Sequence, residues 1–150
     1  MADYANRLGP PQIHLAGLQI WVHSRQFPEA ADYWDANWIN VTVHCGAKGA
    51  DVWASGAILH LPEIKGWAAG CEQMYKTLTG EAKLDCMGPE LSVGLKMEGQ
   101  GHISMEVSIT PDHLTQEHTF QFEIDQSYLT GLVNECHQLL AAYPIREGKK

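Results

Sequence analysis

Eight histidines, four cysteines and eighteen acidic residues are the groups in this 150-residue chain that could do chemistry. Imidazole, thiolate and carboxylate are together the usual ligands of zinc. His44 and Cys45 are neighbours in a segment that alternates like a β-strand, so their side chains point to opposite faces and cannot share one ion. His113 and His118 lack the HExxH spacing that places two ligands on one face of a helix. The spacing therefore predicts isolated histidines, with no metal and no other cofactor.

The sequence has no motif for nucleophilic catalysis or phosphate binding. There is no GxSxG elbow, and Gly99-Gln100-Gly101 does not continue as GxGxxG or as a P-loop. No spacing singles out a pair of carboxylates for acid–base work. The cysteines lack CxxC spacing and fall on the apolar phase of their segments, which predicts reduced, buried thiols at Cys45, Cys71, Cys86 and Cys136. We therefore predict no catalytic residues and a protein that is not an enzyme.

Three of the five tryptophans lie in the stretch YWDANWINVTVHCGAKGADVW, from Tyr33 to Trp53. Trp38 and Trp53, like Trp21, are out of phase with the aliphatic residues of their strands, so they point away from the face that helices would cover. They form either a second small core under the loop of residues 27–34 or the anchors of an interface. The candidate partner-binding residues are Asp32, Trp34, Asp35, Trp38 and Trp53.

Apolar periodicity predicts the elements that position these residues. Two amphipathic helices are expected, one from Pro62 to Gly80 and one from an N-cap at Asp125 to Pro144. Their apolar stripes are Ile64, Trp67, Ala68, Cys71, Met74, Tyr75 and Leu78, and Leu129, Leu132, Val133, Cys136, Leu139, Leu140 and Tyr143. Period-two alternation predicts strands at residues 13–23 (with a break at 16–17), 37–45, 52–58, 82–86, 91–97, 103–109 and 118–124.

This order of elements predicts an α+β domain, with one mostly antiparallel sheet of about six to seven strands and both helices packed on one face. The expected boundaries are a flexible lead-in at residues 1–12, a single domain at 13–144 and a tail at 145–150. The two stripes use the same offsets, each with a cysteine at the same position. Either an internal duplication or the ordinary period of amphipathic helices explains that match.

Charge and hydropathy narrow the class of partner. The formal net charge of −8 disfavours nucleic acid, and no apolar run is long enough to span a membrane. The first residues lack the apolar core of a signal peptide, so we expect a cytoplasmic protein. An acidic surface suits a basic partner protein, or it simply keeps the domain soluble.

The segment Asp35-Ala36-Asn37-Trp38-Ile39-Asn40-Val41 resembles the D-x-N-W-[LI]-N-V strand of WapI-like immunity proteins. The order of a second strand, a helix with the entry LHLPEI and a strand-rich second half is similar as well. The histidines, the cysteines and the segment ITPDHLTQEHTFQF lie outside the shared pattern. The resemblance implies a protein without enzymatic activity that neutralises a bacterial toxin, and a basic toxin would suit the negative charge.

Three functions are therefore to be compared. The first is toxin neutralisation through an acidic sheet face or edge that contains tryptophans. The second is a structural or regulatory homo-oligomer, such as a homodimer that pairs exposed sheet edges. The third is a small-molecule binder whose pocket collects His44, His102 or His118 beside a carboxylate.

Overall fold

Eight strands pair strictly in chain order and form two antiparallel sheets in the computed structural model, which describes residues 7–148. The first sheet contains β1 (Ile13–Leu15), β2 (Leu18–Arg25), β3 (Trp38–Ala47) and β4 (Ala50–His60). The second contains β5 (Glu81–Asp85), β6 (Leu91–Gly99), β7 (His102–Ile109) and β8 (Thr119–Asp125). The helices α2 (Tyr33–Ala36), α3 (Leu61–Thr77) and α4 (Ser127–Ala142) complete the α+β fold.

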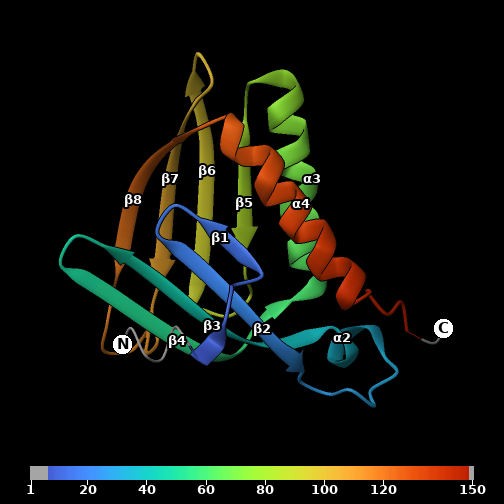
Figure 1. Cartoon of the computed structure of the whole chain (residues 1–150). Helices are drawn as coiled ribbons and strands as arrows, with labels where there is room; N and C mark the ends of the chain where they lie inside the picture. Colours follow the sequence, from blue (N-terminus) through green and yellow to red (C-terminus); the bar gives the residue numbers. More distant parts are fainter. Residues whose placement is uncertain (1–6, 149–150) are drawn as a thin grey trace.

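The prediction of one sheet with six to seven strands is wrong. Helix α3 follows β4 directly and lies beside β5, so the hydrogen-bonded ladder is interrupted between these two strands. Figure 1 shows the two sheets crossing, with α3 and α4 packed against each other at the side of β5. Alternation within a strand identifies the strand but not the place where a sheet ends, because that depends on long-range packing.

The sheets and the two long helices share one hydrophobic core. The predicted inward face of β3 is confirmed, since Ile39, Val41, Val43 and Cys45 are fully buried. On the first stripe, however, Tyr75 and Leu78 are 50% and 44% exposed. Leu78 has left the helix and serves as its C-cap with a left-handed φ of 54°, while Tyr75 borders an open groove between α3 and α4.

Local signals fix the ends of both helices. Glu63 accepts a hydrogen bond from the His60 N–H at 2.8 Å, and Pro62 occupies the first turn of α3. The prediction of Asp125 as the N-cap of α4 is wrong by one residue, because Gln126 is the N-cap; the Asp125 carboxylate nevertheless accepts the N–H of Ser127 at 2.8 Å. No helix in the described part of the chain is long and apolar enough to cross a membrane.

The two halves share one order of elements, a four-stranded meander followed by a long helix. Helix α3 packs beside β5 of the second sheet, and α4 contacts β1 of the first. Each long helix thus contacts the sheet of the other half, as two copies of one unit packed together would do. The internal duplication stays a hypothesis.

Candidate binding surface around helix α2

Four of the five candidate residues lie together at one end of the first sheet. Asp32, Trp34 and Asp35 are on or beside the short helix α2, and Trp38 begins β3 immediately after it. We call these four residues the α2 patch. Trp53 is elsewhere, since it pairs with His44 of β3, and the six residue steps from Trp38 to His44 span about 20 Å of strand.

The aromatic rings of the α2 patch pack against a buried histidine. The rings of Trp34 and Trp38 meet edge to face with centroids 6.2 Å apart, and both contact the imidazole of His60, at 5.0 and 4.9 Å. His60 is 2% exposed, and its Nε2 donates to the carbonyl of Trp34 at 2.9 Å. Trp34 itself is 51% exposed, so a supported indole faces solvent, as an interface anchor would.

The carboxylates of the α2 patch are exposed, and no cationic side chain within residues 7–148 forms an ion pair with them. Asp32 caps α2 by accepting the N–H of Asp35 at 2.8 Å. The ion pairs between described residues all involve histidines on other elements, so neither aspartate is paired within that part of the chain. An unpaired carboxylate beside an exposed indole suits a guanidinium or ammonium group, which can pair with the first and stack on the second.

Two arginines nearby are occupied with backbone carbonyls. Arg25 donates to the carbonyls of Ala36, at 2.7 Å, and Pro144. Arg146 donates to those of Pro28 at 2.6 Å and Ala30 at 3.1 Å. Burial, and then the positive charge of Arg146, lower the pKa of Arg25. These bonds tie the loop before β3 to β2 and to the end of the chain.

Asn37 joins the α2 patch to the end of the chain. Its Nδ2 donates to the carbonyls of Tyr33 at 2.7 Å and Arg146 at 2.8 Å, and its Oδ1 accepts the N–H of Arg146 at 2.8 Å. Asn37 is fully buried, and its own carbonyl accepts the N–H of Leu61 at 2.9 Å. A loop tied down in this way needs little further ordering when a partner binds.

Asn37, His60, Arg25 and Arg146 were all missed by sequence reasoning as parts of this surface. Asn37 lies within the D-x-N-W segment, and an asparagine directly before a strand is the one local signal of this support. The contacts of Arg146 join positions more than a hundred residues apart, and no local pattern signals them.

The profile of the immunity protein WapI-like family matches residues 11–144 of the chain. The chain belongs to this family. Comparison with curated proteins gives no match. The matched range contains the α2 patch, Asn37 and both sheets of this WapI-like protein, and membership of an immunity-protein family indicates a toxin-neutralising role.

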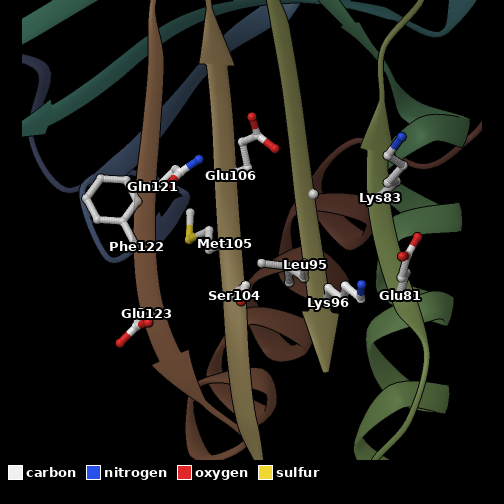
Figure 2. A pocket seen from close by; sticks show the side chains of 11 residues that line it. Glu81, Lys83, Leu95, Lys96, Ser104, Met105, Glu106, Gln121, Phe122 and Glu123 are labelled. Carbon is white, nitrogen blue, oxygen red and sulfur yellow. The ribbon is translucent and has the colours of Figure 1, made fainter. Parts of the chain in front are cut away.

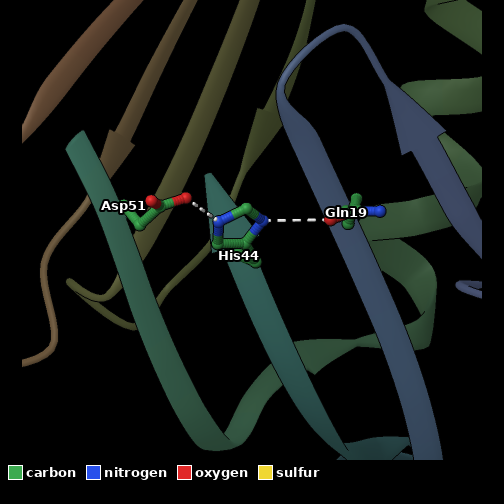
Figure 3. Close-up of polar contacts among 3 residues, drawn as sticks. All are labelled: Gln19, His44 and Asp51. Atoms are coloured by element: carbon green, nitrogen blue, oxygen red, sulfur yellow. Dashed lines mark hydrogen bonds and ion pairs between the residues drawn. The ribbon is translucent and has the colours of Figure 1, made fainter. Parts of the chain in front are cut away.

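Trp53 belongs to a second cluster at the opposite end of the β3–β4 hairpin. His44 contacts Gln19 of β2 at 3.0 Å and Asp51 of β4 at 2.7 Å, and so links three strands (Figure 3). The Trp53 ring lies 4.4 Å from that imidazole and stacks on Trp21 at 5.7 Å. These contacts tie β2, β3 and β4 together beside the turn of the hairpin.

The tryptophans thus divide between the two interpretations. Trp21 is 2% exposed and donates from Nε1 to the carbonyl of Gly9 at 2.8 Å, so it belongs to a small covered cluster. The covering segment is the one around Gly9, whereas the sequence predicted residues 27–34. Trp34, by contrast, is the exposed tryptophan of the α2 patch.

Histidines of this WapI-like protein are distributed over separate elements. His44 pairs with Asp51 on the first sheet, His102 with Glu123 at 3.6 Å on the second, and His137 of α4 with Glu72 of α3 at 2.9 Å. Within residues 7–148, no three His, Cys, Asp or Glu side chains come together as metal ligands.

All four cysteines are free, as predicted. Cys45, Cys71 and Cys136 are buried, and burial raises the pKa of each to about 12, so they are thiols at neutral pH. Cys86 is half-buried rather than buried, and burial raises its pKa as well.

Proposed function

We propose that this WapI-like protein neutralises a basic toxin in the cytoplasm by binding it through the α2 patch. The observation that carries the proposal is the exposed indole of Trp34 beside the unpaired carboxylates of Asp32 and Asp35, on a loop held by Asn37 and Arg146. Family membership supplies the class of partner, and the surface supplies the chemistry of recognition.

Electrostatics support a basic partner. The chain carries a net charge of −8, which accelerates the approach of a positively charged protein and repels acidic ones. At contact, an arginine or lysine of the toxin would stack on Trp34 and pair with Asp35. Such a complex weakens as salt is added, because the Debye length shortens. Occlusion of the toxin's active surface needs no catalytic group on this chain.

The test uses a candidate basic toxin domain from the same genome, sought first among the genes next to this one, in an inactive form for binding and in an active form for growth assays. Isothermal titration calorimetry measures Kd for the wild type and for Trp34→Ala. Truncation of a hot-spot tryptophan costs about 2 kcal/mol or more, which corresponds to roughly 30-fold weaker binding. Growth protection during co-expression should fall in parallel.

Tyr128→Ala is the matched control for the aromatic side chain, because Tyr128 is 45% exposed on α4, away from the α2 patch. Asp85→Asn serves in the same way for Asp35→Asn, since both carboxylates are exposed. If Trp34→Ala and Tyr128→Ala lost equal affinity for the toxin, or if neither lost any, the toxin would bind elsewhere.

A further inference from the structure

The outer face of the second sheet carries a groove that the proposed toxin contact does not use. It has a volume of about 570 Å³, within the range of small-ligand sites, and it runs over β5 to β8. Its floor is made by the smallest residues of the face, Gly94 and Ser104. Figure 2 shows Glu81, Lys83 and Lys96 on the β5–β6 side and Glu106, Gln121 and Glu123 on the β7–β8 side.

Strand register sets the spacing of these charges. Gly94 pairs with Lys83 on one neighbouring strand and with Glu106 on the other. The two charged residues are therefore two strand spacings apart, which is about 10 Å at their backbones. In the next row, Lys96 is separated from Glu123 by Ser104 in the same way. Positive groups thus face negative groups twice across the floor. Glu81 lies opposite Lys96 in the same register, and Glu98 accepts the Ser104 hydroxyl at 2.9 Å, so the open part of the floor is at Gly94.

These charges are not used inside the protein. Neither Lys83 nor Lys96 forms an ion pair within the part of the chain that the structure describes, and Glu123 contacts only His102, at 3.6 Å. A Cβ placed on Gly94 would have no atom within 4 Å, so the floor is open above the strand. Most sheet positions carry a side chain that would fill such a space.

We propose that the groove binds a short peptide with free termini, its carboxylate held by Lys83 and Lys96 and its ammonium group by Glu106 and Glu123. Three extended residues span about 10 Å, which matches the separation of the two charged sides. Complementary charge at both ends selects a zwitterion over a simple anion or cation. The inference rests on the sheet alone and is independent of toxin binding.

Trialanine with free termini is the probe, and binding is followed by amide chemical shifts of the ¹⁵N-labelled chain. We expect shifts confined to β5–β8 that saturate at millimolar peptide. Acetylation of the amino terminus or amidation of the carboxyl terminus should weaken binding about tenfold or more, because each removes one charged group of the peptide and with it both of that group's ion pairs. Lys83→Gln should act like amidation, whereas Lys76→Gln, on α3, should leave binding unchanged.

Filling the floor gives a second test that does not alter charge. Gly94→Val places a favourable strand residue where there is space, so the variant should fold and lose binding. Ser92→Val, on the same strand and face but outside the groove, is the matched control and should bind normally. Blocked peptides that bind as well as trialanine, shifts outside β5–β8, or full binding by Gly94→Val would each overturn the proposal.

Discussion

Replacing Asn37 by alanine removes the side chain that fixes the α2 patch to the end of the chain. The side chain makes three hydrogen bonds, to the carbonyls of Tyr33 and Arg146 and from the N–H of Arg146. Asn37 is fully buried, so water cannot replace it without local opening. The variant should therefore lose stability and order in residues 27–38, while both sheets are retained.

The magnitude follows from the number of bonds. Each contributes about 1 kcal/mol net, and leaving backbone groups unpaired adds to the loss, so Asn37→Ala should cost about 3 kcal/mol. For a domain of this size, that lowers Tm by roughly 10 °C. Asn40→Ala is the matched control, because half-buried Asn40 makes a single side-chain bond, to Ser24 at 3.1 Å, and should cost about 1 kcal/mol.

Urea unfolding followed by tryptophan fluorescence measures both variants. The free energy of unfolding should fall with urea concentration at the same slope in the wild type and both variants, so that a shift in the midpoint reports a change in stability. If Asn37→Ala proved no less stable than Asn40→Ala, Asn37 would not be the fastening point of the loop. A binding loss without a loss of stability would likewise refute the reasoning and point to direct contact with the partner.

Further predictions concern packing, thiols and pH. Gly17→Ala should destabilise the fold strongly, because its Cβ would lie 2.1 Å from the carbonyl oxygen of Gly46. Gly131 is in an open position of α4, so Gly131→Ala should raise stability by about 0.5–1 kcal/mol. Thermal melts measure both changes. The cysteines should resist alkylation at neutral pH in the native protein and react in urea, as mass spectrometry would show, since burial raises every thiol pKa. Hydrogen bonds from the Ser127 hydroxyl and then its N–H lower the pKa of Asp125, so its contribution is present at neutral pH and lost as pH falls through that lowered value. The Tm difference between wild type and Asp125→Ala should therefore vanish in strong acid.

The sequence was sufficient for the two long helices and for most strands, because their apolar periods are regular over many residues. Residues 13–23, predicted as one strand with a break at 16–17, form the separate strands β1 and β2 with a tight turn at that break. The inward set of β3 from Ile39 to Cys45 follows from alternation alone. The separation of Trp53 from Trp38 was also implicit, since a turn at residues 48–49 places Trp53 opposite His44 and Trp38 opposite His60. Trp38 and Trp53 therefore lie at opposite ends of the hairpin and cannot belong to one cluster.

Long-range contacts were beyond sequence reasoning. The break between the sheets depends on where α3 inserts, and no residue in β4 or β5 signals it. The support of the α2 patch comes from Arg146, which is far along the chain from Asn37. A single sequence gives no information on such a pair, although a buried asparagine before a strand would have suggested that a fixed loop was present.

Hydrogen exchange with and without the toxin tests the central proposal most directly. Amide groups of residues 27–38 are compared in the free protein and in the complex, by mass spectrometry. We predict slower exchange there on binding, centred on Trp34, and unchanged exchange in β5–β8. Protection of another surface, with residues 27–38 exchanging as in the free protein, would contradict the assignment of the α2 patch as the toxin-binding site.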